Sequence, residues 1–212
     1  MNKQKEQLET LLEIRSLMER SSRFLSLSGF SGVISGIAAI AGIAAAYLYL
    51  GISPDEPGYY KFAVKDNGEP NPAFYAFFLA DIAIVLIVSL LAATLLTIKK
   101  ARKKGQSVWD ATARRLLVNM AIPLVAGGLY CMILLYHGHI AFIAPATLIF
   151  YGLALLNASK YTLNDIRALG VIEIIIGLIA SVFIEYSLLF WTLGFGILHI
   201  VYGMVMYYKY EK

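Results

Sequence analysis

Three ionisable residues, Asp81, Glu173 and His199, lie inside long apolar stretches of this sequence. A charged side chain in the hydrocarbon of a membrane is costly, so such residues usually face the interior of a helix bundle and find a polar partner there. A carboxyl group and an imidazole at the same depth can share a proton, which would make them a site for protons or for a substrate. The chemistry open to this chain therefore depends on which of the three residues meet.

Glu173 and His199 are equidistant in sequence from Tyr186, where the last two apolar stretches turn. In an antiparallel helix pair, residues equidistant from the turn lie at similar depth. At 1.5 Å per residue, Glu173 lies about 10 Å and His199 about 13 Å from the inner ends of their helices. We predict that they meet in the inner half of a membrane. Three interpretations stay open: a proton- or substrate-binding site, a structural bond between packed helices, and side chains that face different neighbours.

Two further sets of polar residues lie in apolar stretches. Asn119 and Asn157 are equidistant from Gly138 and form a candidate interhelical amide pair. Asp81 lies about 12 Å from the outer end of its stretch, with no Lys or Arg at that depth. It is a candidate for lining a cavity, for binding an ion, or for being protonated.

No metal ion or other cofactor is expected. His137 and His139 share one turn, but two histidines without a nearby acid or cysteine are weak zinc ligands. Haem held between helices needs facing histidines at like depth, and only His199 is deep. The single cysteine, Cys131, excludes a disulfide within the chain. Zincin, P-loop and nucleophile-elbow motifs are absent from the sequence, so we do not expect an enzyme.

The composition places these residues in a membrane protein. Of 212 residues, 59% are hydrophobic and 15% are charged, whereas soluble domains are about 25% charged. The mean hydropathy is +0.69, and a soluble fold of this length could not bury so much apolar surface. The formal net charge of +4 comes from basic residues in short loops. This pattern indicates membrane topology and not nucleic-acid binding.

The expected fold class is all-α, a polytopic membrane protein with a bundle of six transmembrane helices, because each span needs about 20 apolar residues. The spans are expected at residues 24–50, 73–98, 116–136, 140–157, 166–184 and 188–208. They form one membrane domain, 24–212. All Lys and Arg except Lys61 and Lys65 fall on one side of these spans, so the positive-inside rule predicts that both termini are cytosolic.

The first span has small residues on two faces. They recur at every fourth position, as Ser28, Gly32 and Gly36 on one face and as Ala38, Gly42 and Ala46 on the next. Such spacing lets other helices approach the backbone closely. Beyond Arg23 this span has no ionisable residue, so we expect it to support a site and not to form one.

The N-terminal 23 residues have the pattern of an amphipathic helix, with leucine, isoleucine and methionine at helical spacing between charged residues. We expect this cytosolic helix to lie on the membrane surface, on its own bundle or on a partner protein. The segment ERSSRFLSLSG, residues 19–29, leads into the first span and resembles a group of uncharacterised six-span bacterial inner-membrane proteins. The resemblance implies a multi-pass protein of the bacterial inner membrane and supplies no activity or site residue.

Two functions are compatible with this pattern. The first is a non-enzymatic scaffold or regulatory membrane subunit that contacts a protein partner, or a second copy of itself, through the N-terminal helix. The alternative is a small proton- or solute-coupled transporter or channel that uses Glu173 and His199, with Asp81 as a further candidate. In either case the lipid bilayer surrounds the apolar spans.

Overall fold

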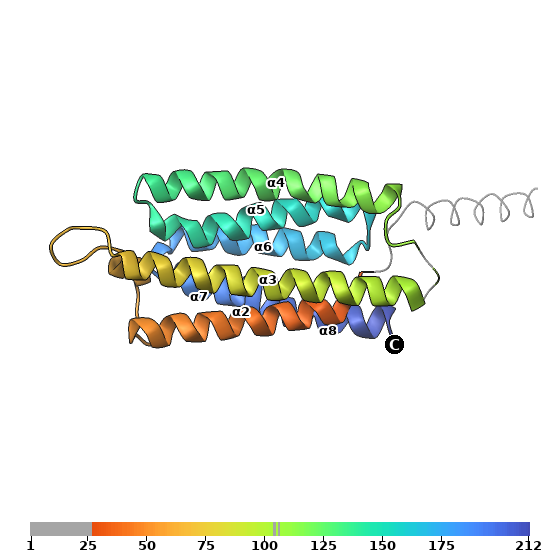
Figure 1. Cartoon of the computed structure of the whole chain (residues 1–212), viewed down its shortest axis with the longest axis horizontal. Coiled ribbons are helices and arrows are strands. Elements are labelled where there is room, and N and C mark those ends of the chain that lie inside the picture. Colours follow the sequence, from red (N-terminus) through yellow and green to blue (C-terminus); the bar gives the residue numbers. More distant parts are fainter. Residues whose placement is uncertain (1–26, 104, 106) are drawn as a thin grey trace, which may run out of the picture.

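The computed structural model of the chain describes residues 27–103, 105 and 107–212. In this range the helices lie side by side along one long axis (Figure 1). The described residues contain no β-strand, only an isolated bridge between Val64 and Pro70. The predicted amphipathic helix at residues 1–23 lies outside the described residues, as does most of the segment that carries the family resemblance.

Five segments in the described range are long and apolar enough to span a membrane. They are α2 (Gly29–Leu50), α3 (Pro72–Lys103), α4 (Ala111–Tyr136), the segment Ile140–Tyr161 around α5 (Ile143–Ala158), and the segment Ile184–Tyr210, which contains α7 (Ser187–Trp191) and α8 (His199–Tyr210). α6 (Asp165–Val182) occupies the place of the predicted fifth span. Its 18 residues include Asp165, Arg167 and Glu173, and it is not among the five.

Two helices extend beyond their predicted ends. α3 continues past Ile98 to Lys103, because Lys, Ala and Arg favour helix and basic side chains suit the negative end of the helix dipole. α4 begins at Ala111, before the membrane span predicted from Leu116. Its start is fixed by Asp110, whose side chain accepts a hydrogen bond from the backbone N–H of Ala113 at 2.7 Å.

Glycines determine which helices pair most closely. α2 packs on α8 and on α3, and α5 packs on α4 and on α6. A Cβ atom added to Gly203 of α8 would lie 2.6 Å from the backbone nitrogen of Val33 and 2.7 Å from the carbonyl oxygen of Gly29. Between α5 and α6, Gly152 and Gly170 face each other's carbonyl oxygens in the same way. These helices therefore touch through their backbones, as small residues in membrane helices allow.

The long loop between α2 and α3 closes one end of the bundle, here called the loop end. A short 3₁₀ helix, η1 (Tyr59–Ala63), buries Tyr59 and Ala63 in a cluster with Phe74 and Leu188. The backbone N–H of Gly58 donates to the carbonyl oxygen of Glu185 at 2.9 Å. Burial raises the pKa of Tyr59. The loop is thus part of the packed structure.

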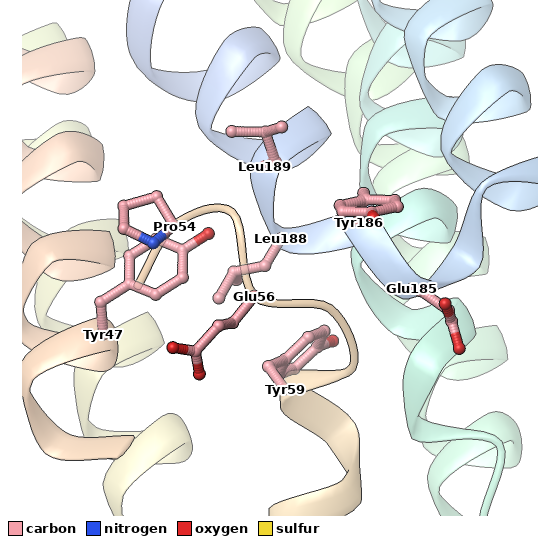
Figure 2. Close-up of a pocket in the computed structure, with 8 residues that line it drawn as sticks. All are labelled: Tyr47, Pro54, Glu56, Tyr59, Glu185, Tyr186, Leu188 and Leu189. Carbon is pink, nitrogen blue, oxygen red and sulfur yellow. The ribbon is translucent and has the colours of Figure 1, made fainter. Parts of the chain in front are cut away.

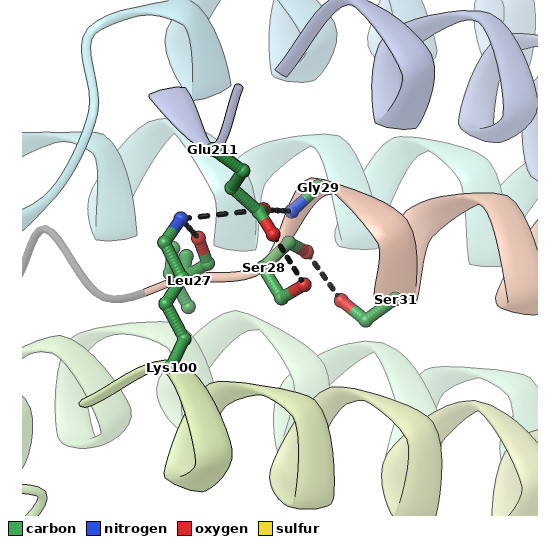
Figure 3. A network of polar contacts seen from close by, with 6 residues as sticks. All are labelled: Leu27, Ser28, Gly29, Ser31, Lys100 and Glu211. Atoms are coloured by element: carbon green, nitrogen blue, oxygen red, sulfur yellow. Dashed lines mark hydrogen bonds and ion pairs between the residues drawn. The ribbon is translucent and has the colours of Figure 1, made fainter. Parts of the chain in front are cut away.

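The opposite end, here called the basic end, joins three helix termini through Glu211 (Figure 3). Its carboxylate accepts hydrogen bonds from the backbone N–H of Gly29 and from the hydroxyl of Ser28, at 3.3 Å for the latter. The Lys100 ammonium lies 3.2 Å from the same carboxylate and donates to the carbonyl oxygen of Leu27. A carboxylate at the start of α2 also suits the positive end of the helix dipole.

We expect Glu211→Ala to lower the free energy of unfolding by about 2 kcal/mol, because α2 loses its cap and Lys100 loses an ionic partner. The stability of Glu211→Gln should lie between that of the wild type and that of Glu211→Ala, because an amide oxygen can still accept the hydrogen bond from Gly29. Thermal unfolding in detergent measures the effect, with the neighbouring exposed Lys212→Ala as the control. Equal melting temperatures for Glu211→Ala and Lys212→Ala would contradict the role of this network.

Candidate functional site

Glu173 lies midway along α6 and is fully buried, with 0% of its surface exposed. Neither of its carboxyl oxygens has a hydrogen-bond partner among the described residues. Gly194 provides the space for it, because a Cβ atom there would lie 2.5 Å from Oε2 of Glu173 and 2.5 Å from Cδ2 of Leu148. A buried carboxyl group without hydrogen-bond donors is stable only when it is protonated or paired with a cation.

The imidazole of His199, which becomes a cation when it takes up a proton, is the partner within reach. Its Nδ1 lies 3.4 Å from Oε1 of Glu173 and 3.0 Å from the carbonyl oxygen of Gly194. Its Nε2 lies 2.9 Å from the hydroxyl of Tyr151. A carbonyl oxygen can only accept, so Nδ1 carries a hydrogen. In the neutral ring Nε2 then accepts the hydrogen bond that Tyr151 donates.

Two protonation states of this pair have the same net charge of zero. In one, a neutral Glu173 carboxyl lies beside a neutral His199 ring, and in the other a carboxylate lies beside an imidazolium. Neither state buries a net charge. The low-polarity interior therefore favours one state over the other less strongly than it favours the neutral form of a single buried ionisable group. Loss of the shared proton, in contrast, would leave a buried negative charge. The geometry therefore suits the binding of one proton.

A π-helical segment, η5 (Thr192–Leu198), brings these groups together. The sequence predicted a span at residues 188–208, and the helical segment Ile184–Tyr210 contains it. Within this segment α7, η5 and α8 follow one another, which the sequence did not predict. Gly194 and Gly196 lie in the segment, and glycine favours the α-helix least of all residues except proline. π-Turns inside α-helices are frequent at functional sites. Here the turn presents the Gly194 carbonyl to His199 and an open space to Glu173.

Aromatic rings enclose the imidazole. Phe195 stacks on His199 with ring centroids 5.7 Å apart, and it contacts Tyr151 and Trp191 at 5.1 Å and 4.7 Å. The indole N–H of Trp191 donates to the hydroxyl of Thr147 at 3.1 Å. An environment of aromatic rings has low polarity, so the interaction between Glu173 and His199 is stronger there than it would be in water.

Asp81 does not join this pair. It lies on α3, half-buried against the small face of α2. A Cβ atom on Gly42 would lie 3.0 Å and 3.1 Å from the two carboxyl oxygens of Asp81 and 2.7 Å from Cγ2 of Val85. The small face predicted for the first span therefore accommodates Asp81. The structure therefore does not combine Asp81 with Glu173 and His199 in a single site.

The candidate amide pair between Asn119 and Asn157 is also not formed. Nδ2 of Asn119 donates to the carbonyl oxygen of Arg115, one turn earlier in the same helix, at 2.8 Å. No hydrogen bond joins the two amides in the described part of the chain. A polar side chain near a helix end often satisfies itself locally in this way, and sequence symmetry about a turn does not reveal it.

Tyr151 and Gly194 are site residues that the sequence did not predict. Tyr151 and Glu173 are equidistant from Thr162, in the turn between α5 and α6, so the spacing that paired Glu173 with His199 could have found it. Gly194 gives no such signal, because its role depends on the π-helical turn.

A shallow pocket lies at the loop end (Figure 2). Its lining residues are Tyr47, Pro54, Glu56, Tyr59, Glu185, Tyr186, Leu188 and Leu189. Glu56 and Glu185 are exposed and therefore hydrated, and Asp81, Glu173 and His199 do not line the pocket. Within the described ranges no three His, Cys, Asp or Glu residues are grouped as metal ligands would be.

No protein-family model, no curated protein and no solved structure matches this chain. Its function has to be inferred from its own residues.

Proposed function

We propose that the protein is an integral membrane protein of six spans that translocates protons, with Glu173 and His199 as the proton-binding site. The observation that carries this proposal is the fully buried Glu173 carboxyl group. It has no hydrogen-bond donor among the described residues, and it lies 3.4 Å from an imidazole. Ionisable residues inside membrane spans mark proton and ion pathways in pumps and transporters. The protein is proposed as a transporter or channel and not as an enzyme.

In this proposal α6, the fifth span in chain order, is the one added to the five apolar segments. Its 18 residues have a length of about 27 Å, close to the hydrocarbon thickness of about 30 Å. Asp165 and Arg167 lie in its first turn, where they can reach the headgroup region. The charge bias of the loops supports cytosolic termini, and the segment at residues 19–29 supports a bacterial inner membrane.

A structural role for the pair is the main competing interpretation, and the geometry favours it less. A bond that merely fastens helices gains most when every buried polar atom is satisfied. Here both carboxyl oxygens lack partners. The scaffold or regulatory-subunit hypothesis depends on the N-terminal helix, which lies outside the described residues.

Infrared titration of the purified protein tests proton binding directly. We expect lowering the pH to produce a carbonyl band of a protonated carboxylic acid, shifted in heavy water and absent from Glu173→Gln. The matched control is Glu185→Gln, because Glu185 is exposed and pairs loosely with Lys61 at 3.9 Å. If the spectra of Glu173→Gln and the wild type titrate identically, Glu173 is not the proton-binding group.

A further inference from the structure

The hydroxyl oxygen of Tyr202 is buried and has no hydrogen-bond partner among the described residues. Tyr202 follows His199 on α8 by three residues, so the two side chains lie on neighbouring faces about 4.5 Å apart along the helix axis. Buried hydroxyl groups in proteins are paired with protein atoms or with ordered water. The unsatisfied hydroxyl of Tyr202 lies one turn from the proton-binding site. Water can therefore connect this hydroxyl to His199.

On its other side, Tyr202 is within electrostatic range of Asp165 and Tyr210. Asp165 begins α6 at the basic end and accepts hydrogen bonds from Lys209 at 2.9 Å and from Tyr210 at 2.5 Å. The Lys209 ammonium and the Tyr210 hydroxyl stabilise the ionised form of this carboxyl group. A carboxylate that stays ionised, at the solvent-facing end of a helix, attracts protons and orders water around it.

The helix packed on the opposite side of α8 contributes no competing ionisable group. α2 faces α8 through glycines: a Cβ atom on Gly32 would lie 3.2 Å from Cα of Gly203, and one on Gly36 would lie 2.6 Å from the carbonyl oxygen of Gly196. The titratable groups around the route are therefore Glu173, His199 and Tyr151 at the site, and Asp165, Lys209 and Tyr210 at the basic end, where the Lys100–Glu211 pair also lies.

Toward the loop end the nearest polar side chains are already satisfied. The hydroxyl of Thr147 donates to the carbonyl oxygen of Ala144 at 2.7 Å and accepts from the indole N–H of Trp191 at 3.1 Å. The Phe195 ring packs against Trp191 in the same region. The other buried hydroxyl without a hydrogen-bond partner among the described residues is that of Ser187, which begins α7. It precedes His199 by twelve residues, about 18 Å along the helix axis, whereas Tyr202 follows His199 by one turn. The unpartnered hydroxyl next to the site is therefore the one on the basic side.

We propose that Tyr202 relays protons between the basic end, at Asp165, and the Glu173–His199 pair. This inference rests on the proposed function and names the side from which that site exchanges protons. In an inward transfer the Tyr202 hydroxyl accepts a proton from a hydronium ion on the Asp165 side and donates its own to a water molecule on the His199 side, which passes one proton to the pair. Rotation of the hydroxyl then restores the starting state, so one proton moves and Tyr202 gains none.

Tyr202→Phe tests the relay because it removes only the hydroxyl. After a rapid acid pH jump, the growth of the Glu173 carboxylic acid band in the infrared gives the rate of protonation. We expect Tyr202→Phe to slow this growth at least about tenfold, as for a lost proton-transfer group, while the equilibrium titration keeps its midpoint. Tyr208→Phe, on the same helix and 64% exposed, is the matched control with the wild-type rate.

Thermal unfolding of both variants separates a relay from a structural role. Since the Tyr202 hydroxyl has no protein partner among the described residues, its loss should not lower the melting temperature. A wild-type rate in Tyr202→Phe would overturn the relay, and so would equal slowing in Tyr208→Phe. Failure of the proposed function has a different signature, because the Glu173 band itself would then be missing from the wild-type titration.

Discussion

Liposomes that contain the Glu173→Gln variant are expected to take up protons no faster than empty liposomes. Liposomes with the wild-type protein should acidify when a potassium diffusion potential drives protons inward, as reported by a trapped pH-sensitive dye. An amide cannot exchange a proton with His199 at 3.4 Å, so the variant retains the shape of the site and loses the carboxyl group that shares a proton with the imidazole. The expected effect is therefore complete loss and not a partial decrease.

The fold should survive this substitution. Both oxygens of Glu173 lack hydrogen-bond partners among the described residues, so replacing the carboxyl group by an amide of similar size removes no bond of the native state. Glu185→Gln, on the exposed surface of the loop end, should conduct like the wild type. Two results would refute the proposal: wild-type uptake by Glu173→Gln, or wild-type protein that conducts no better than empty liposomes.

Gly203→Ala is expected to be strongly destabilising, because it adds a methyl group at the contact between α2 and α8. The new Cβ atom would lie 2.6 Å from the nitrogen of Val33, 2.7 Å from the oxygen of Gly29 and 3.0 Å from the carbonyl carbon of Gly32. All three are backbone atoms, so no side-chain rotation relieves the overlap and the helices must separate. Overpacking of this kind costs about 1–3 kcal/mol, against a gain of about 1 kcal/mol in helix propensity.

Gly128→Ala is the matched control, because no atom lies within 4 Å of the position that its Cβ would occupy. It should leave stability unchanged or raise it by up to about 1 kcal/mol. Unfolding in detergent, followed by circular dichroism, compares the two variants. If Gly203→Ala were as stable as Gly128→Ala, the close approach of α2 and α8 would not be a feature of the protein in solution.

Helix content and helix position could be predicted from the sequence because both follow from local hydrophobicity. Runs of apolar residues gave the approximate limits of α2, α4 and the region around α5. Helix ends were less predictable where good helix formers continue past the apolar run, as at Lys103. α6 shows what composition alone cannot reveal. Glu173 lowers the hydrophobicity of this helix, although its side chain is buried inside the bundle and is not exposed to lipid.

The site was only partly predictable, for reasons of geometry. Counting residues from a turn gives the depth of a side chain but not the direction in which it points. This was sufficient for Glu173 and His199, whose helices are neighbours and whose side chains converge. It was wrong for Asn119, which bonds to its own helix, and it could not exclude Asp81, which points at Gly42 of α2.

The π-helical segment has a consequence for how such a site can arise and be lost. A π-turn contains one residue more than the α-turn that it replaces, and each residue turns an α-helix by about 100°. A single-codon deletion within residues 192–198 would therefore restore an ordinary helix and rotate His199 relative to α7 by about that angle. The helical segment would persist with Glu173 and His199 separated. A change of length in this short stretch can therefore disconnect the pair without replacing either of its residues.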